Sequence, residues 1–207
     1  MILHFDRSLT LIELLVAIAL LSLIVLAAAS VQLFSHFHLL TADRQAQLQN
    51  EVSLTLEHMH KYVSQGVGLP TLALETIADG FRVMVDLNPT RSPAQLPTPQ
   101  NLDDDNWIYY ILNGNNLTCS CIEVSASSPT CFRPETLSTH IISNVERNGV
   151  LPASPPFDHG FYINLTDNHT QIEIGLVARF RPEQVVSLDN PQVVMKSRFY
   201  TQNSAAR

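Results

Sequence analysis

The first 65 residues of the sequence contain neither of the two residues that most often end helices. In a chain of 207 residues, the first glycine is Gly66 and the first proline is Pro70. Glycine favours the left-handed helix cap, and proline cannot continue the hydrogen-bond ladder. Residues 9–65 can therefore form one uninterrupted helix, about 85 Å long at about 1.5 Å per residue.

Positive charge is scarce as well. Lysine and arginine total 12 against 19 acidic residues, and the formal net charge is −7. A net negative charge gives no general attraction to the phosphate backbone of nucleic acids or to anionic lipids. We therefore expect that the function requires no nucleic acid.

Motifs of common enzyme classes are missing from the sequence. It has no phosphate-binding loop, no nucleophile elbow and no zinc-protease helix motif. We expect a protein that is not an enzyme, with no catalytic residues and no cofactor. A signal-anchored or secreted enzyme is an alternative, and it would require polar residues that converge in a pocket.

Cysteine is limited to Cys119, Cys121 and Cys131. An odd count permits at most one internal disulfide, which would persist in an oxidising compartment. Cys119 and Cys121 are two apart and would share one face of a strand, so either can approach Cys131. Zinc needs about four ligands, and three cysteines with the distant His140 or His159 make a weak case, so we expect a disulfide and no metal site.

One long hydrophobic run lies close to the N-terminus. Residues 14–33 are apolar except for Ser22, Ser30 and Gln32. A helix of about twenty residues spans about 30 Å, which is the thickness of a bilayer core. Arg7 stands before the run and favours a cytoplasmic N-terminus. We therefore expect a single-pass membrane helix.

Glu13 is a charged residue at the edge of this apolar run. An Asp at the centre of a membrane helix costs about 2.5 to 3.5 kcal/mol, so this carboxylate needs water at the headgroups or a partner. Its surroundings, SLTLIELLVAIA over residues 8–19, closely resemble the cleavage and methylation motif of prepilins. By this motif the chain is similar to the type IV pilin-like family.

The resemblance implies how the N-terminus is processed and used. A prepilin peptidase would cut between Ser8 and Leu9 on the cytoplasmic side and N-methylate Leu9, so that residues 1–8 are a leader peptide. Ser8 stands where the family has glycine, and Leu9 where it has phenylalanine. Glu13 would align subunits in a filament by meeting the N-terminal amine of a neighbour. An amine and a carboxylate that are each disfavoured in an apolar bundle become tolerable as a pair.

An ordinary secretory signal is the rival interpretation of the same residues. Arg7, the apolar residues 14–26 and the alanines 27–29 before Ser30 fit such a signal with small-residue cleavage. Cleavage there would release a soluble protein. This interpretation gives Glu13 no role, and it does not explain why the helical pattern continues beyond residue 30.

The second half of the expected helix, residues 34–66, has an apolar stripe. Its members recur at helical spacing and should pack on a globular domain: Leu48, Val52, Leu56, Met59 and Val63. Two His-x-His pairs lie on the same half, His36 with His38 and His58 with His60. Residues two apart on a helix do not share a face, so we expect neither pair to bind a metal. Gly66, Gly68 and Pro70 should end the helix.

The remainder, residues 67–207, is predicted to be a β-rich domain. Strands are expected at residues 81–87 and 193–200, with hairpins formed by 107–112 with 117–124 and by 161–165 with 171–180. The first hairpin has an Asn113-Gly114 turn. Residues 88–106 and 149–160 are proline-rich and should be loops, and the acidic residues 103–105 are expected to be solvated.

Together these patterns predict an α+β fold of pilin type. A long N-terminal helix, with residues 9–33 as its transmembrane and filament-core half, would pack on an antiparallel β-sheet domain. The resemblance implies a structural subunit of a type IV pilus or a type II secretion pseudopilus. Its expected partners are prepilin peptidase, other pilins and the inner membrane, with the N-terminus cytoplasmic and the domain periplasmic.

Finer features suggest a minor subunit that initiates or caps the filament. The size, the proline-rich insertions and the C-terminal strands resemble the W-type minor pilins and the J-type minor pseudopilins of type II secretion. An alternative is a binding module at the filament tip that recognises a surface, DNA or a secreted substrate. An aromatic or basic patch on the loops would support that alternative.

Overall fold

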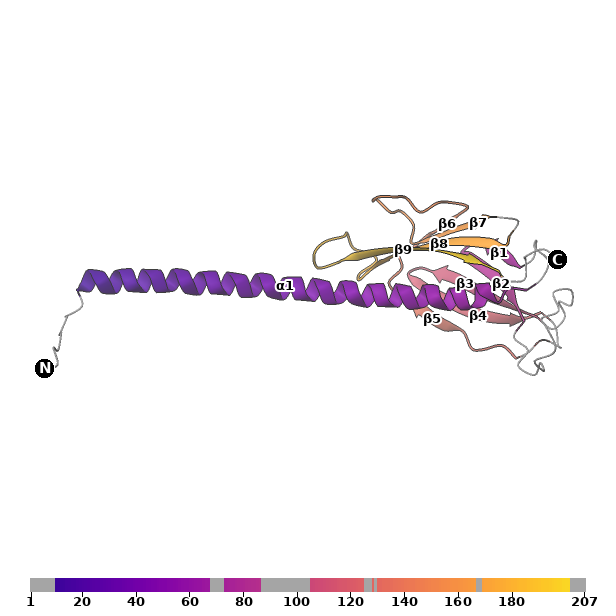
Figure 1. Ribbon diagram of the computed structural model, residues 1–207, viewed down its shortest axis with the longest axis horizontal. Coiled ribbons are helices and arrows are strands. Elements are labelled where there is room, and N and C mark those ends of the chain that lie inside the picture. Colours follow the sequence, from indigo (N-terminus) through magenta and orange to yellow (C-terminus); the bar gives the residue numbers. More distant parts are fainter. Residues whose placement is uncertain are drawn as a thin grey trace.

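A computed structural model describes residues 10–67, 73–86, 105–124, 128, 130–166 and 169–201 of the chain. It consists of one long N-terminal helix and a β domain that packs on the C-terminal half of that helix (Figure 1). The expected leader and the cleavage position between Ser8 and Leu9 lie outside the described residues, as do residues 88–104 of the predicted loop over residues 88–106. Asn106, the last residue of that predicted loop, instead begins a strand.

The helix α1 runs without interruption over Leu11–Ser64, as the sequence predicts. It begins with a capping box, in which the hydroxyl of Thr10 accepts a hydrogen bond from the backbone N–H of Glu13 at 3.3 Å. This arrangement satisfies donors that the first helical turn leaves without a partner. The helix is capped at Gln65, and the N–H of Gly66 donates to the carbonyl of Val63 at 3.0 Å. Gly68 and Pro70, which were expected to help end the helix, lie outside the described residues.

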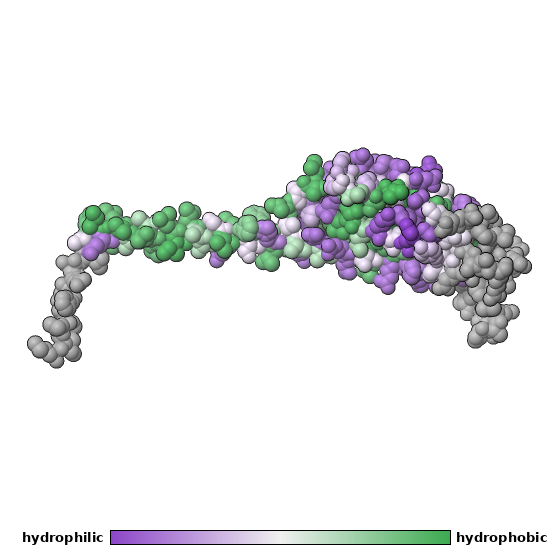
Figure 2. All heavy atoms as spheres, turned by 45° about the horizontal axis from the view of Figure 1, so that its top comes forward, coloured by the Kyte–Doolittle hydropathy of each residue, from purple (hydrophilic) through white to green (hydrophobic). Residues whose placement is uncertain are grey.

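The two halves of α1 have different surroundings. All five residues of the predicted stripe are buried against the domain, and Thr55 is buried beside them. The hydroxyl of Thr55 donates to the carbonyl of Glu51 at 2.9 Å and to that of Leu137 at 3.3 Å. In the N-terminal half every described side chain is exposed, and the surface is hydrophobic over most of its length (Figure 2).

The domain contains two β-sheets, which were not distinguished by the sequence pattern. The first has five antiparallel strands in sequential order: β1 Leu74–Ile77, β2 Gly80–Val85, β3 Asn106–Asn113, β4 Asn116–Glu123 and β5 Glu135–Ser138. The second has four strands, also in sequential order: β6 Val145–Arg147, β7 Phe161–Thr166, β8 Gln171–Arg179 and β9 Gln192–Tyr200. Only the β6–β7 pair of the described strands is parallel. The fold class is therefore α+β with mainly antiparallel sheets, as predicted.

A single large core joins the helix to both sheets. Phe81 of β2 stacks on Tyr110 of β3, with ring centroids 4.9 Å apart, and meets Phe161 of β7 edge-on at 6.2 Å. All three side chains are fully buried. Aromatic contacts of this kind hold the two sheets together over the buried stripe of α1.

Several strands are covered on both faces. Met84 lies on the same face of β2 as the partly exposed Arg82, yet it is buried. Every residue of β8 from Gln171 to Ala178 is buried. A second cluster causes part of this burial, since Ile142, Phe157, Tyr162 and Val177 pack on the outer side of β7 and β8.

The β3–β4 turn lies one residue beyond the predicted position. Asn113 pairs with Asn116, so the two central turn residues are Gly114 and Asn115 instead of Asn113 and Gly114. Gly114 has φ 60°, which is the backbone that a glycine at the first central position of a type II′ turn provides.

One expected solvent-exposed acid is buried. Asp105 was predicted to belong to a solvated acidic loop, but only 1% of its surface is exposed. Its backbone carbonyl accepts a hydrogen bond from the hydroxyl of Ser128 at 2.7 Å. The prediction was wrong for Asp105 because this residue directly precedes β3 and is covered by the segment that follows β4, whereas residues 103 and 104 lie outside the described part.

Candidate functional site

The N-terminal half of α1 is an exposed apolar rod. Its large hydrophobic side chains between Leu11 and Leu39 all have more than half of their surface exposed, and α1 is long and apolar enough to cross a membrane. An apolar surface of this size marks a membrane or protein contact in a stable protein. The rod is therefore the candidate functional site.

Two serine hydroxyls on the rod are satisfied by its own backbone. The hydroxyl of Ser22 donates to the carbonyl of Ala19 at 2.8 Å, and that of Ser30 donates to the carbonyl of Leu26 at 2.8 Å. Such internal hydrogen bonds let hydroxyls enter a lipid or helical environment without an unpaired donor.

Glu13 lies at the start of the rod. Between Thr10 and Ala42 it is the only acidic or basic residue other than histidine. Its carboxylate accepts hydrogen bonds from the N–H and from the hydroxyl of Thr10, both at 2.9 Å. These donors are neutral, so they orient the carboxylate but leave its charge uncompensated. The position is suited to a cationic partner from outside the chain.

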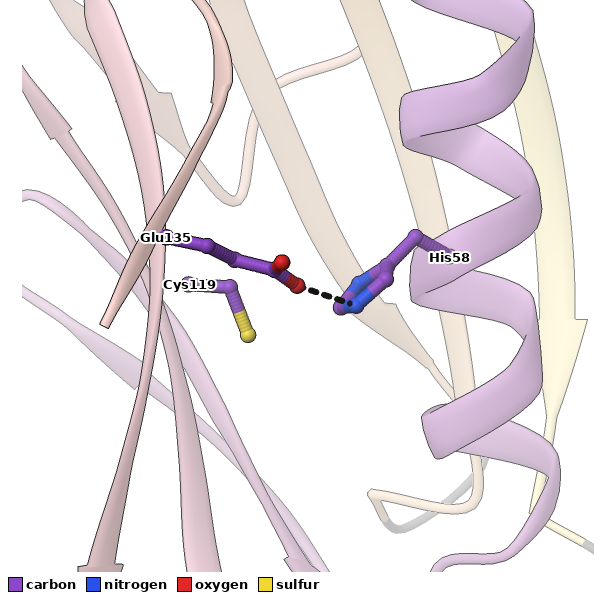
Figure 3. A group of neighbouring side chains, drawn as sticks. All are labelled: His58, Cys119 and Glu135. Atoms are coloured by element: carbon purple, nitrogen blue, oxygen red, sulfur yellow. Dashed lines mark ion pairs between the residues drawn. The ribbon is translucent and has the colours of Figure 1, made fainter. Parts of the chain in front are cut away.

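A polar cluster holds the other end of α1 against the first sheet (Figure 3). Tyr110, Cys119 and Glu135 are cross-strand neighbours on β3, β4 and β5, and His58 of α1 lies over them. The Nε2 of His58 lies 2.8 Å from the carboxylate of Glu135, and its Nδ1 lies 3.2 Å from the hydroxyl of Tyr110. The cluster therefore connects the helix with three strands.

Burial determines the protonation states in this cluster. It lowers the pKa of His58 below its ordinary value, although the carboxylate of Glu135 acts in the opposite direction. We therefore assign a neutral imidazole at neutral pH, with Nε2–H donating to Glu135 and Nδ1 accepting from Tyr110. Burial also raises the pKa of the Cys119 thiol to about 12, so this thiol is protonated.

His58, Cys119 and Glu135 are residue types that bind metals. One potential ligand atom from each lies within 4.8 Å of the others. A zinc ligand must be a thiolate and a structural zinc site uses about four protein ligands, whereas Cys119 is a neutral thiol and both nitrogens of His58 have protein partners. Hydrogen bonding and packing thus account for the cluster.

The two histidines of the second His-x-His pair do lie on different faces of α1. His58 contacts Tyr110, whereas the ring of His60 packs on Phe199 of β9, with centroids 5.5 Å apart. The contact between His58 and Glu135 was not predicted, because no local pattern connects residues so far apart in the sequence.

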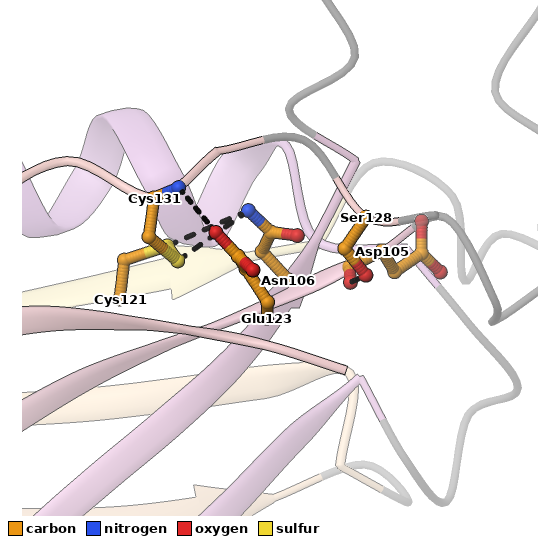
Figure 4. Close-up of a disulfide and its surroundings, with 6 residues drawn as sticks. All are labelled: Asp105, Asn106, Cys121, Glu123, Ser128 and Cys131. Atoms are coloured by element: carbon orange, nitrogen blue, oxygen red, sulfur yellow. Dashed lines mark hydrogen bonds between the residues drawn. A yellow bond between two sulfur atoms is a disulfide. The ribbon is translucent and has the colours of Figure 1, made fainter. Parts of the chain in front are cut away.

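The three cysteines separate into a disulfide and a free thiol. Cys121 of β4 is bonded to Cys131, with Cα atoms 5.4 Å apart, and Cys119 is free and buried (Figure 4). The amide of Asn106 lies 3.5 Å from the sulfur of Cys121, and the N–H of Cys131 donates to Glu123 at 3.1 Å. The bridge fastens the segment that contains Cys131 to the end of β4, where Cys121 packs against the main core.

Comparison with known proteins gives a match at the start of the rod. Residues 5–29 match the family model described as the prokaryotic N-terminal methylation motif. No curated protein and no solved structure gives a significant match to the chain. The matched range includes Ser8, Leu9 and Glu13.

The architecture defines a membrane-anchored α+β protein with a long N-terminal helix. The methylation motif at the start of that helix supports a type IV pilin-like or pseudopilin-like subunit. The motif implies processing by prepilin peptidase and assembly with other pilins.

Proposed function

We propose that this protein is a minor pilin or minor pseudopilin that initiates or caps a filament. Prepilin peptidase cuts it between Ser8 and Leu9 and N-methylates Leu9. The rod then packs among the helices of neighbouring subunits while the β domain stays on the outside. The observation that carries the proposal is the exposed apolar half of α1 with Glu13 at its start, inside the methylation motif.

In this proposal Glu13 aligns the subunit with its neighbours in the filament. Within the described part of the chain, its carboxylate has only the neutral donors of Thr10. The amine of a neighbouring subunit would neutralise the charge, and any other register would leave both charges unpaired in an apolar bundle. The pair therefore specifies register more than it adds stability.

The proposed topology has the N-terminus in the cytoplasm, α1 across the inner membrane and the β domain in the periplasm. The Cys121–Cys131 disulfide supports this orientation, since such bonds persist in oxidising compartments. A minor role is supported by the uninterrupted α1, because the family's major pilins commonly have a proline in the membrane run, where the helix loosens.

A binding module at the filament tip is less well supported. The guanidinium of Arg82 lies 4.2 Å from the ring centre of Trp107 and also bonds to Tyr109, which forms an aromatic and basic cluster on the first sheet. Arg82 is nevertheless paired with Glu75. Its charge is therefore neutralised within the chain.

The direct test is to express the full chain with and without a prepilin peptidase. Intact mass and N-terminal sequencing of the membrane-extracted protein should show a peptidase-dependent start at methylated Leu9. A start at Ser30 would instead identify an ordinary secretory signal, and an uncut chain in the presence of an active peptidase would refute the assembly mechanism.

A further inference from the structure

The loop between β8 and β9, residues 180–191, exposes three aliphatic side chains. Val185 is 85% exposed, Val186 48% and Leu188 72%. Single exposed aliphatic residues are common, but three within four positions form an apolar patch. We refer to residues 180–191 as the β8–β9 loop.

The β8–β9 loop is held in one shape by Asn190, which is buried. The side-chain amide of Asn190 donates to the carbonyls of Arg181, Gln184 and Val185 at 3.0, 3.2 and 3.1 Å. Its side-chain oxygen accepts from the N–H of Arg181 at 2.7 Å. The polar backbone is thus satisfied inside the loop, and the aliphatic side chains are presented on a preformed surface.

The loop is also fastened to α1. The hydroxyl of Thr41 donates to the carbonyl of Leu188 at 2.6 Å, and Arg44 forms an ion pair with Asp189. The guanidinium of Arg44 lies 4.8 Å from the ring centre of Phe180. The position of the loop along the helix is therefore well defined.

An apolar groove lies where the loop meets the helix. Leu188 lines it together with residues that directly follow the membrane run, namely Phe34, Phe37, His38, Leu40 and Thr41. In Figure 1 the β8–β9 loop is the part of the domain that projects furthest toward the N-terminal half of α1, and in Figure 2 this end of the domain is hydrophobic. The patch thus continues the apolar surface of the rod.

The rise of α1 per residue gives the position of this groove relative to the bilayer. A hydrocarbon core of about 30 Å takes about twenty residues, so a span over the apolar run of residues 14–33 ends at Leu33. The helix residues of the groove, Phe34 to Thr41, then lie about 1.5 to 12 Å farther out, at about 1.5 Å per residue. Because the headgroup layer adds about 5 to 7 Å on each side, the groove starts at the acyl boundary and passes through the outer headgroups.

We propose that the β8–β9 loop is a second membrane contact, in which Val185, Val186 and Leu188 enter the outer headgroup and acyl boundary of the bilayer that holds α1. The inference rests on the membrane anchoring in the proposed function. Continuity with the rod identifies lipid as the occupant of the patch. Arg181 and Glu183 carry opposite charges, so insertion depends on apolar contact and little on anionic lipid.

Attachment at two points would fix the rotation of the β domain about the axis of α1. A helix alone leaves this rotation free, whereas the loop selects the side of the domain that faces the bilayer. The contact must break when the subunit is drawn into a filament, so it stabilises the subunit before assembly.

The test uses single-tryptophan variants of the full chain in phosphatidylcholine vesicles with brominated acyl chains. Trp107 is the natural tryptophan and is first replaced by Trp107→Phe. Val185→Trp reports on the loop, Leu23→Trp reports on the rod, and Val124→Trp, at an exposed valine directly after β4, is the matched control. Bromine close to the glycerol backbone should quench Val185→Trp at least twofold and leave Val124→Trp unchanged.

The outcomes separate the loop from the anchor. Quenching of Leu23→Trp without quenching of Val185→Trp overturns the loop contact and leaves the membrane anchor in place. If Leu23→Trp is not quenched, the anchor and the proposed function both fail. A blue shift of Val185→Trp that appears only at a high protein-to-lipid ratio, without quenching, assigns the patch to a second copy of the chain and overturns the lipid proposal. Leu188→Trp repeats the measurement if Val185→Trp does not fold.

Discussion

The carboxylate of Glu13 and the hydroxyl of Thr10 lie 2.9 Å apart, and together they form the cap of a helix that is otherwise mostly apolar for about its first six turns. The same carboxylate thus has two possible roles, in capping and in alignment. The two roles can be separated by substitution, because only alignment needs the negative charge.

Glu13→Gln should keep most of the cap but prevent filament assembly. The amide oxygen can still accept from Thr10, whereas it cannot neutralise the amine of a neighbour. We expect normal membrane insertion and cleavage, with at least a tenfold loss of the protein from sheared filaments. Thr10→Ala is the matched control, since it removes the cap at a cost of about 1 kcal/mol and keeps the charge. Equal losses in both variants would assign Glu13 to capping alone.

The rate of cleavage should depend on the size of the side chain at position 8, directly before the cut. Ser8→Gly should be cut at least as fast as the natural sequence, whereas Ser8→Val should be cut at least tenfold more slowly, because a branched side chain is larger and stiffer. Pulse labelling and intact mass of the membrane fraction measure the rates. Rapid cutting of Ser8→Val would mean that steric size at this position does not control processing.

Stability should fall as the pH falls below about 6.5, partly through His58. Burial lowers the pKa of His58 in the folded protein. Between that lowered pKa and the ordinary value of about 6.5, the unfolded chain binds more protons, so acidification favours unfolding.

His58→Gln should therefore make the thermal midpoint less sensitive to pH between 7.5 and 5.5. The expected difference from the natural protein is a few degrees, since about 1 kcal/mol shifts the midpoint of a chain of this size by about 2 to 4 °C. Circular dichroism of the detergent-solubilised full chain measures it. His60→Gln is the control, and a similar effect of this variant would assign the pH dependence to groups other than His58.

Removal of the disulfide should lower the free energy of unfolding by about 2 to 3 kcal/mol, as expected for a short closed loop. The variant should carry both Cys121→Ser and Cys131→Ser, because Cys119 can otherwise pair with the remaining cysteine. Cys119→Ala keeps the bridge and is the control for the loss of a buried side chain. Denaturant unfolding of the three proteins gives the comparison, and an unchanged free energy in the double variant would contradict a structural role.

The free thiol of Cys119 should be unreactive in the folded protein. Burial raises its pKa to about 12, and only the thiolate reacts readily with alkylating reagents. Iodoacetamide at pH 8 should modify one cysteine after unfolding without reductant, and none before. Fast modification of the native protein would place Cys119 in contact with solvent.

Local periodicity predicted the elements that repeat a simple pattern. The extent of α1, the stripe that includes Val52 and Met59, and the β7–β8 pair all follow from spacing along the chain. The same patterns missed the short strands β1, β5 and β6, which have only three or four residues each. Such strands are defined by their partners in the sheet, and they are too short to show a period.

Contacts between distant segments required the structure. Cys121 and not Cys119 is bonded to Cys131, because the inward side of β4 at Cys119 is occupied by Tyr110 and the helix. Two further contacts depend on how the sheets pack on α1: His58 lies beside Glu135, and the β8–β9 loop packs on Thr41. No pattern along the sequence contains this information.

The internal hydrogen bonds of Ser22 and Ser30 affect how a subunit can travel. Because these hydroxyls are satisfied by Ala19 and Leu26, residues 14–31 of the rod offer their neighbours mainly dispersion contacts, which vary little as one helix slides along another. Over this part of the rod the energy of axial movement therefore changes little until Glu13 reaches its partner. A subunit can therefore move out of the bilayer along the filament axis over low energy barriers, and the pairing of Glu13 defines the one register in which it stays.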